Sequence, residues 1–267
     1  HTSALFGFIN QIMKLINKDK PDLMVAAFDS SKKTFRHEKY PEYKATREKM
    51  PEEMVAQLPY LWKILESMGI PTLERPGFEA DDIIGTLATM AAKEELDVYI
   101  VSGDKDFMQL VNEKIFLYAP SGRQADIKIY DRNGVVDKWG VPPEKIIDLL
   151  GLMGDSSDNV PGVPGVGEKT AVKLINEYGS LEASLDHADE VKNKRAREGL
   201  QNAKSEALLS KELVTIDTKM NLDIDFSTLK TNDIDKESLV DIFQELEFET
   251  LQKQILGAEG AVQKNKD

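Results

Sequence analysis

Hydrophobic positions over the first 130 residues alternate between helical spacing and short apolar runs. Helical spacing is found from Leu5 to Ile16, from a start at Pro51 through Met68 to a stop at Gly69, and from about Ala80 to Glu95. Runs of strand length lie at 23–28, 98–102, 115–118 and 127–130. Strands that alternate with helices predict an α/β fold, with a mostly parallel sheet and helices on both faces.

The second half of the chain has a different pattern, because strand signals nearly vanish after about residue 132. We therefore expect an α/β core over residues 1–140, a helical subdomain over 141–256, and a polar linker or tail over 257–267. An α/β core of this kind normally begins with a strand, whereas this chain begins with a helix. We expect a first strand to precede His1.

Composition narrows the class of protein. With 41% hydrophobic and 30% charged residues among 267, the chain is typical of a globular protein. No apolar run approaches the roughly 20 residues that a membrane span needs, so no membrane association is expected. The absence of cysteine excludes disulfides and thiolate sites and fits a reducing, cytoplasmic location. A net charge of −13 argues at face value against a nucleic-acid partner, but the distribution of the charge matters more than its sum.

Eight of the acidic residues form four groups. The first group follows a predicted strand, the second begins a predicted helix, the third follows the strand at 98–102, and the fourth has two acids three residues apart. They are Asp29; Glu79, Asp81 and Asp82; Asp104 and Asp106; and Asp155 and Asp158. Ligands of open parallel sheets bind outside the carboxyl ends of the strands, where the first three groups fall, so we expect the groups to converge.

Such a cluster of carboxylates suits hard divalent cations. Clustered acids repel one another, and Mg²⁺ or Mn²⁺, which take oxygen ligands, relieve this repulsion. Two such ions can activate a water molecule and stabilise the leaving oxygen of a phosphodiester. Zinc is not favoured, because the only histidines are His1, His37 and His187, and none lies near an acid pair at ligand spacing. The competing interpretation is that the acids are solvated turns and helix caps.

Residues 160–171 combine three glycines with the start of an amphipathic helix. The backbone N–H groups of Gly162, Gly165 and Gly167, together with Lys169 and Thr170, are candidates for contact with a phosphate. The segment is not a P-loop, because Glu168 follows Gly167 where that motif has lysine. An ordinary glycine-rich turn is the alternative.

Basic and aromatic residues are interleaved between Ser31 and Met50. They are Lys32, Lys33, Arg36, Lys39, Lys44, Arg47 and Lys49, with Phe35, Tyr40 and Tyr43. Basic side chains neutralise phosphates and aromatic rings stack on unpaired bases, so the segment suits single-stranded DNA. It could equally be a solvated charged loop. A second basic run near Lys194 is more typical of a solvated helix face.

Taken in order, these motifs resemble the 5′-nuclease family, which includes the N-terminal domain of bacterial DNA polymerase I, phage exonucleases and flap endonucleases. The resemblance covers nearly the whole chain. It rests on Phe28-Asp29, Thr34 through Arg47, Phe78 through Asp82, Asp104 through Leu110, Gly154 through Asn159, and Gly162 through Ala171. The stretch Leu246-Glu247-Phe248 with the polar tail resembles the exit toward a polymerase module. One departure is small: Phe78 stands where the family usually has tyrosine.

The resemblance implies a fold, a reaction and a set of ligands. The fold is a PIN-like nuclease core with a helical arch at about 31–50, followed by a helix-hairpin-helix at about 155–178. Asp29, Glu79, Asp81 and Asp82 would serve one metal ion, and Asp104, Asp106, Asp155 and Asp158 another. Arg36, Lys44 and Arg47 would hold the scissile phosphate or the threaded strand, and the hairpin could bind K⁺. The expected reaction is hydrolysis of DNA at 5′ ends and flaps, with RNA primers as possible substrates, by a monomer in the bacterial cytoplasm and nucleoid.

Two alternatives remain open from the sequence. The family's first strand carries another metal-binding aspartate, and no residue of this chain supplies it; without it the fragment would bind DNA junctions but cleave poorly or not at all. A more distant alternative is a phosphatase-like or ribonuclease relative that uses the same acids. The glycine hairpin favours the DNA-acting proteins over this last group.

Overall fold

The computed structural model describes residues 3–121, 126–230 and 234–260 and divides the chain into two compact units. Unit 1 consists of His1–Phe28, Glu48–Leu73 and Asp223–Asp267, and unit 2 consists of Asp29–Arg47 and Glu74–Leu222. Each unit is built from segments that are distant in the sequence. None of the helices in the described segments is long and apolar enough to cross a membrane.

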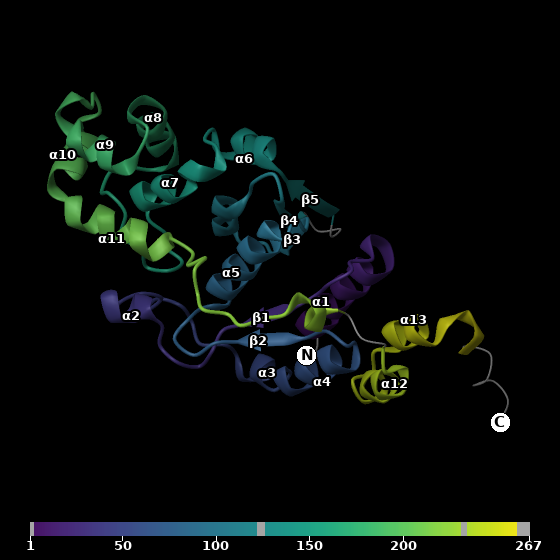
Figure 1. Cartoon of the computed structure of the whole chain (residues 1–267). Coiled ribbons are helices and arrows are strands. Elements are labelled where there is room, and N and C mark those ends of the chain that lie inside the picture. Colours follow the sequence, from purple (N-terminus) through teal and green to yellow (C-terminus); the bar gives the residue numbers. More distant parts are fainter. Residues whose placement is uncertain (1–2, 122–125, 231–233, 261–267) are drawn as a thin grey trace. The chain divides into compact units, whose positions relative to one another are not determined.

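The elements follow the predicted order of helices and strands (Figure 1). The helices are α1 Ser3–Lys14, α2 Phe35–Lys39, α3 Glu52–Val55, α4 Leu58–Ser67, α5 Ala80–Lys93, α6 Arg132–Trp139, α7 Ile146–Met153, α8 Glu168–Tyr178, α9 Leu181–Asp186, α10 Lys194–Asn202, α11 Lys204–Val214, α12 Lys236–Glu245 and α13 Glu249–Gly260. The strands are β1 Ala26–Phe28, β2 Thr72–Glu74, β3 Val98–Val101, β4 Ile115–Ser121 and β5 Asp126–Tyr130. A π-helical turn, η1 Leu15–Asp19, continues α1, and short 3₁₀ turns are η2 Lys105–Leu110, η3 Pro143–Lys145, η4 Ala188–Glu190 and η5 Phe226–Leu229.

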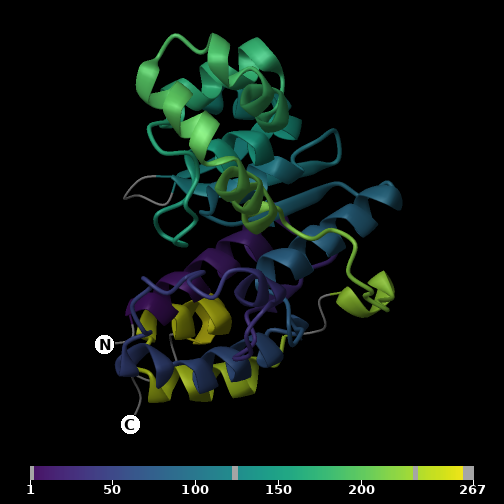
Figure 2. The ribbon, with the colours of Figure 1, turned by 90° about the vertical axis from the view of Figure 1, so that its left-hand side faces the viewer.

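The core of unit 1 is formed by helices from both ends of the chain. Ile9 of α1, Ile64 of α4 and Phe243 of α12 are fully buried and belong to a single apolar cluster. In Figure 2 the yellow helices of the C-terminal segment accordingly lie beside the purple and dark blue helices of the N-terminal segments. Strands β1 and β2 pair as a two-stranded sheet. The spacing of apolar residues in α1, α4 and α12 explains this packing, because each helix presents one apolar face.

Unit 2 contains a three-stranded sheet in the order β3-β4-β5. The pair β3 and β4 is parallel, with Ile100 opposite Leu117, whereas β4 and β5 are antiparallel. Helix α5 packs against β3 and β4, and both Ile100 and Leu117 are buried in the core of the unit. The predicted α/β class is confirmed, and β5 supplies an antiparallel edge to the sheet.

The helices that follow β5 form the second part of unit 2, as the pattern after residue 132 predicts. Helices α7 to α11 gather in one cluster, teal to green in Figure 2. A tight hairpin joins α7 to α8: Asp155 and Val160 exchange backbone hydrogen bonds of 3.0 and 2.7 Å. At its base Gly154 and Gly162 meet so closely that a Cβ on Gly162 would lie 2.4 Å from the Gly154 nitrogen. This is the helix-hairpin-helix that the glycines predict.

The structure differs from the pattern at three places. Strand β2, which pairs with β1, is not predicted from the apolar runs. The helix predicted from Pro51 to Met68 is broken into α3 and α4, because Pro59 has no N–H to donate to the carbonyl of Val55. The predicted tail begins within α13, where Gly257 takes a left-handed φ of 71° and interrupts the helix. The rest of that tail, residues 261–267, lies outside the described residues.

Candidate active site

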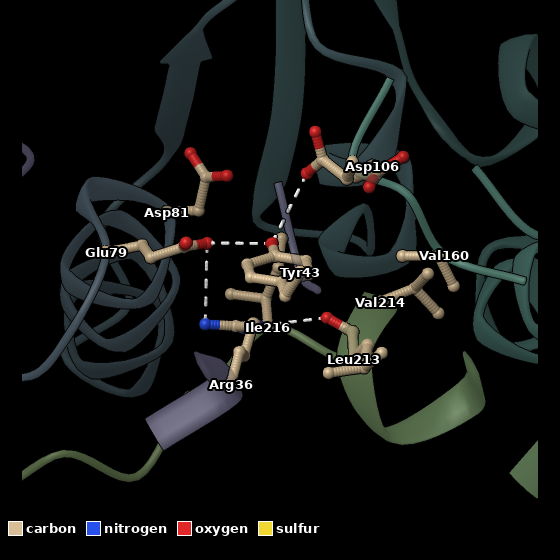
Figure 3. A pocket seen from close by; sticks show the side chains of 10 residues that line it. Arg36, Tyr43, Glu79, Asp81, Asp106, Val160, Leu213, Val214 and Ile216 are labelled. Atoms are coloured by element: carbon tan, nitrogen blue, oxygen red, sulfur yellow. Dashed lines mark hydrogen bonds and ion pairs between the residues drawn. The ribbon is translucent and has the colours of Figure 1, made fainter. Parts of the chain in front are cut away.

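The predicted acidic groups meet within unit 2. Glu79, Asp81, Asp106 and Asp158 line one small pocket together with Tyr43 (Figure 3). They come from the start of α5, from η2 after β3, and from the hairpin after α7. Acidic side chains from three segments that are distant in the sequence therefore converge at one place, as the order of strands and acids predicts.

The first turn of α5 is fixed by acidic side chains. Glu79 is its N-cap and forms a capping box with Asp82, whose Oδ2 accepts the Glu79 N–H at 3.1 Å. The exposed Asp29 accepts the backbone N–H of Ala80 at 2.8 Å. Negative charge at a helix N-terminus is favourable, so these acids stabilise the helix as well as the site.

Arg36 and Asp82 form a buried pair at the base of the site. The Nη1 and Nη2 atoms of Arg36 donate to the two oxygens of Asp82 at 2.7 and 2.8 Å, and both residues are at most 2% exposed. Arg36 also donates to the carbonyls of Leu213 and Thr215, and Asp217 N–H donates to Asp82. The sequence predicted a phosphate contact for Arg36 and a metal ligand in Asp82. Both side chains are buried and pair with each other in this structure, while Arg36 also lines the pocket, with its Nη1 3.5 Å from Glu79 Oε2.

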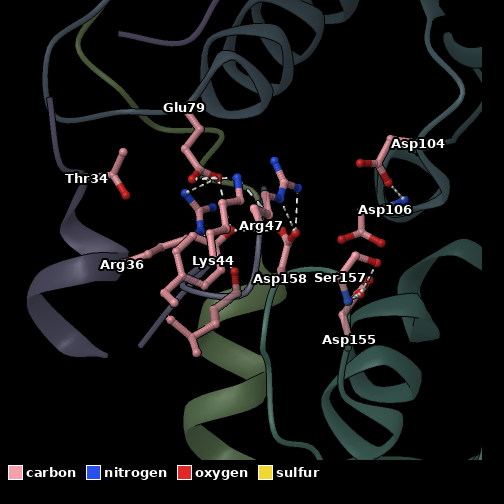
Figure 4. A network of polar contacts seen from close by, with 12 residues as sticks. Thr34, Arg36, Lys44, Arg47, Glu79, Asp104, Asp106, Asp155, Ser157 and Asp158 are labelled. Atoms are coloured by element: carbon pink, nitrogen blue, oxygen red, sulfur yellow. Dashed lines mark hydrogen bonds and ion pairs between the residues drawn. The ribbon is translucent and has the colours of Figure 1, made fainter. Parts of the chain in front are cut away.

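Lys44 and Arg47 bring the basic segment onto the acids (Figure 4). Lys44 Nζ lies 2.8 Å from Glu79 Oε1 and 3.8 Å from Asp158 Oδ2, and Arg47 Nε donates to Asp158 Oδ1 at 2.9 Å. Lys44 has a left-handed φ of 57°, and its N–H donates to the carbonyl of Asp158. The basic segment is thus tied to the hairpin through both its backbone and its cations.

Tyr43 differs from its predicted role as a base-stacking residue. The residue is only 4% exposed, and its hydroxyl donates to Glu79 Oε2 at 3.1 Å and lies 3.3 Å from Asp158 Oδ2. Burial and the two neighbouring carboxylates raise the pKa of the Tyr43 hydroxyl, so it stays a hydrogen-bond donor. Tyr43 is therefore a buried residue whose hydroxyl contacts Glu79 and Asp158 and helps to position them.

The third acidic group lies at the start of η2 and is linked to the fourth group, in the hairpin, through Lys105. Asp104 is the N-cap of η2 and accepts the Asp106 N–H at 2.9 Å. Asp155 Oδ1 accepts the Ser157 N–H and hydroxyl, while Asp155 Oδ2 lies 2.9 Å from Lys105 Nζ. Asp106 Oδ1 is buried and has no hydrogen-bond partner among the described residues.

Crowding of the carboxylates perturbs two of them. Burial, with the charge of Asp104 next, raises the pKa of both Asp81 and Asp106 to about 7. By contrast the pKa of Asp155 is lowered, since hydrogen bonds from Lys105 and Ser157 outweigh the effect of burial. The unrelieved charge is therefore concentrated around Asp81, Asp104 and Asp106.

The carboxylates do not form a closed ligand set in this arrangement. Within the residues that the structure describes, no three His, Cys, Asp or Glu side chains are grouped so that they could hold a metal ion. Lysine and arginine side chains lie against Glu79, Asp155 and Asp158 instead. The donor set nevertheless consists of oxygens, and Asp106 has an unpartnered buried oxygen, which fits a hard divalent cation.

The glycine hairpin offers fewer free donors than the sequence predicts. The Gly162 N–H donates to Ser210 Oγ at 2.9 Å and is buried, so it is not available to a phosphate. Gly167 and Lys169 are exposed at the N-terminus of α8, and Gly165 and Thr170 are half-buried. The exposed part of the hairpin is the start of α8.

The remaining predicted DNA contacts lie on the basic segment before Tyr43. Lys32 and Lys33 are exposed, and Phe35 and Tyr40 are half-buried. Lys105, which pairs with Asp155, is a charged residue of the site for which the sequence predicts no role. Its position between two predicted ligands, Asp104 and Asp106, is the only sequence signal that could have indicated it.

Family models match the chain over nearly its whole length. Residues 1–140 match "5'-3' exonuclease, N-terminal resolvase-like domain", and residues 141–237 match "5'-3' exonuclease, C-terminal SAM fold". DNA polymerase I of Bacillus subtilis (strain 168) is 44% identical over 251 residues, which cover 94% of this chain. The thermostable DNA polymerase I of Thermus filiformis is 40% identical over 247 residues, 92% of this chain. The chain spans 28% and 29% of the length of these two relatives.

Solved structures share the fold at lower sequence identity. The T5 5'-exonuclease with bound zinc aligns with a TM-score of 0.68 at 21% identity, covering 96% of this chain and 90% of the other. The catalytic core of Rad2 in complex with a DNA substrate aligns with a TM-score of 0.63 at 20% identity, covering 94% and 83%. These similarities establish the fold.

Proposed function

Because this chain belongs to the 5′-3′ exonuclease family, we propose that it hydrolyses phosphodiester bonds at the 5′ ends and flaps of DNA. The observation that carries the proposal is the convergence of acidic groups from α5, η2 and the hairpin, with Lys44 and Arg47 beside them. Carboxylates that gather metal ions and cations that meet phosphate are the two parts that phosphodiester hydrolysis requires.

Divalent cations fit the acidic cluster by the chemistry of its donors. Asp81, Asp104 and Asp106 would hold Mg²⁺ or Mn²⁺ together after their side chains draw closer, since no three carboxylates of the described residues are grouped for a metal ion. Asp155, Asp158 and Glu79 would contribute once their lysine and arginine partners move. When bound, such ions polarise the phosphate and lower the pKa of the attacking water. The support is the unpartnered oxygen of Asp106 and the raised pKa of Asp81 and Asp106, which a nearby cation would lower again.

The chain's own cations have the task of binding and orienting the substrate. Lys44 and Arg47 lie at the mouth of the cluster, with side chains 16% and 49% exposed, and can exchange a carboxylate for a phosphate oxygen. Arg36 instead positions α2 against α5, since it is enclosed by Asp82 and two carbonyls. Tyr43 holds Glu79 in place through its hydroxyl.

The DNA contacts proposed outside the cluster are made by residues whose side chains or backbone are at least partly exposed to solvent. Lys32 and Lys33, with Phe35 and Tyr40, would meet the single strand, and Gly167 with Lys169 at the start of α8 would meet the duplex backbone. K⁺ at the hairpin, action on RNA primers, the monomeric state and a nucleoid location are further proposals that rest on the resemblance. So does a polymerase module joined to this domain, for which the partial coverage of the relatives is support.

The division of the chain for this function is also proposed. A nuclease core would occupy residues 1–140 and a DNA-binding helical part residues 141–256. The lengths matched by the two family models support this boundary. The two compact units divide the chain differently, because unit 1 joins the N-terminal and C-terminal helices through a shared core.

Cleavage of a 5′-labelled flap DNA tests the proposal. The chain is incubated with Mg²⁺, with Mn²⁺ and with EDTA, beside Asp104→Ala and a matched control, Asp131→Ala. Both aspartates are exposed N-caps that accept one backbone N–H, Asp104 from Asp106 and Asp131 from Gly134. We expect metal-dependent release of short 5′ products. Loss of an essential metal ligand should lower the rate by about 100-fold or more in Asp104→Ala, and Asp131→Ala should cleave like the parent chain.

Two outcomes would contradict the nuclease function. Equal cleavage by Asp104→Ala and the parent chain would remove the acidic cluster from the mechanism. Binding to the flap that survives EDTA, without cleavage in any metal, would favour the alternative of a DNA-junction binding fragment.

A further inference from the structure

A lysine lies among the acids of the cluster, and the proposed function gives it no task. Lys105 is the first residue of η2, and its Nζ lies 2.9 Å from Asp155 Oδ2. The side chain of Lys105 is 34% exposed and that of Asp155 is 10% exposed, so the pair is partly shielded from water. Charge-assisted hydrogen bonds in such surroundings are strong.

The two oxygens of Asp155 are held by different groups. Ser157 donates to Oδ1 from its backbone N–H at 2.8 Å and from its hydroxyl at 2.7 Å. Lys105 alone approaches Oδ2 among the ion pairs and hydrogen bonds of the described residues. Ser157 is therefore sufficient to orient the carboxylate, and Lys105 contributes the positive charge. Lys105 can leave without loss of the Asp155 orientation.

Among the described residues, no lysine or arginine forms an ion pair with Asp104 or Asp106, the acids on either side of Lys105 in the sequence. Asp104 accepts only backbone N–H groups in the described hydrogen bonds, and Asp106 Oδ1 has no partner. Asp155 lies close enough to Asp106 that its charge acts on the Asp106 carboxyl, and Figure 4 shows the two side chains on neighbouring segments. A doubly charged ion attracted by Asp104 and Asp106 would therefore also meet Asp155. The ion and the lysine ammonium would then compete for Asp155 Oδ2.

We infer that Lys105 is an internal counter-ion, which neutralises Asp155 in the metal-free protein and gives way when a divalent cation binds. The inference rests on the proposed metal-dependent function and deepens it. Lys105 is a positioning residue in this scheme, since it acts through Asp155. Its release would also free an ammonium group beside the incoming phosphate.

Calorimetric titration with Mn²⁺ alone, without DNA, tests the inference. Lys105→Met removes the competing charge, so we expect its Kd for Mn²⁺ to fall about tenfold, the size of one charge-assisted hydrogen bond. The same variant should unfold at a lower temperature than the parent chain in EDTA. Lys105→Arg, which keeps both charge and hydrogen bond, should bind Mn²⁺ as the parent chain does.

Lys211→Met is the matched control. Lys211 Nζ lies 2.7 Å from Asp148 Oδ1, and the side chains of Lys211 and Asp148 are 28% and 9% exposed, close to the values of the Lys105 pair. Lys211 Nζ also lies 2.6 Å from Glu182 Oε1. This pair lies outside the acidic cluster, on α11 and α7. Lys211→Met should therefore lose stability in EDTA while its Kd for Mn²⁺ stays unchanged.

The outcomes separate the inference from the proposed function. Unchanged or weaker Mn²⁺ binding by Lys105→Met would overturn the inference alone, and so would an equal gain in Lys211→Met. Absence of Mn²⁺ binding to the parent chain would overturn the inference and the metal-dependent function together. If circular dichroism shows that Lys105→Met is unfolded, Lys105→Gln, which keeps a donor without the charge, carries the same expectation.

Discussion

Arg36 and Arg132 show how burial decides what an ion pair does. Both arginines use two nitrogens to bind one carboxylate, Arg36 with Asp82 and Arg132 with Glu144. The Arg36 pair is enclosed, whereas the side chains of the second pair are 54% and 53% exposed. Water and salt weaken an exposed pair, while a buried charge that loses its partner remains desolvated.

Arg36→Met is therefore expected to lower the free energy of unfolding by about 3–5 kcal/mol, because Asp82 would stay buried without a counter-charge. Urea unfolding followed by circular dichroism measures the change. Arg132→Met serves as the control and should unfold within experimental error of the parent chain. A small effect of Arg36→Met would mean that Asp82 gains water or a proton easily, and that the pair does not hold α2 against α5.

At the scale of elements, the hairpin between α7 and α8 depends on glycine for two reasons. Gly162 has a left-handed φ of 63°, and its Cα faces the backbone of Met153 and Gly154. A side chain at this position would meet both a strained conformation and a backbone contact that cannot move. Gly167, in the same hairpin, has no atom within 4 Å of a built Cβ and an ordinary φ of −98°.

Gly162→Ala should thus destabilise the chain by more than about 3 kcal/mol, since left-handed strain and a steric clash add. Gly167→Ala should cost at most about 1 kcal/mol, the usual effect of alanine at an N-cap. Thermal unfolding of the two variants beside the parent chain makes the comparison. Similar losses in both would show that the backbone at Gly162 relaxes around an added methyl group.

For the whole molecule, part of the net charge of −13 comes from carboxylates that are crowded into one site. Because this crowding raises the pKa of some of them, the stability of the fold depends on pH. Asp106 has a pKa of about 7 in the folded chain, well above the ordinary value of an aspartate. The folded state therefore binds a proton that the unfolded state releases between about pH 4 and 7. Stability from this group is fully present at low pH, falls as the pH rises through that range, and is constant above it.

Asp106→Asn mimics the protonated form and removes the contribution of Asp106 to this pH dependence, while Asp81, whose pKa is also raised to about 7, keeps its own contribution. In EDTA we expect the variant to be more stable than the parent chain at pH 8, by up to about 4 kcal/mol, and similar to it at pH 4. Urea unfolding at several pH values measures the difference, and Asp131→Asn should keep the slope of the parent chain. A parallel slope in Asp106→Asn would show that the carboxyl is not protonated in the folded state.

The sequence by itself determined the parts of the molecule that depend on local order. Strand-length apolar runs followed at once by acids predict where Asp29, Asp104 and Asp106 lie, because a chain leaving a strand must place its next residues at the sheet edge. Glycines at fixed spacing predict the hairpin in the same way, since few residues accept a left-handed φ. The α/β class and the helical second half follow from periodicity alone.

Only the tertiary structure decided which charges meet. Arg36 and Asp82 are 46 residues apart, and the carbonyls of Leu213 and Thr215 that complete the Arg36 site come from far along the chain. Composition and spacing cannot distinguish an arginine that meets phosphate from one enclosed by carbonyls, or a stacking tyrosine from one beneath a carboxylate. Lys105 and Asp155 illustrate the same limit. Burial and partner choice depend on how distant segments pack, and packing fixes the role of each charged residue.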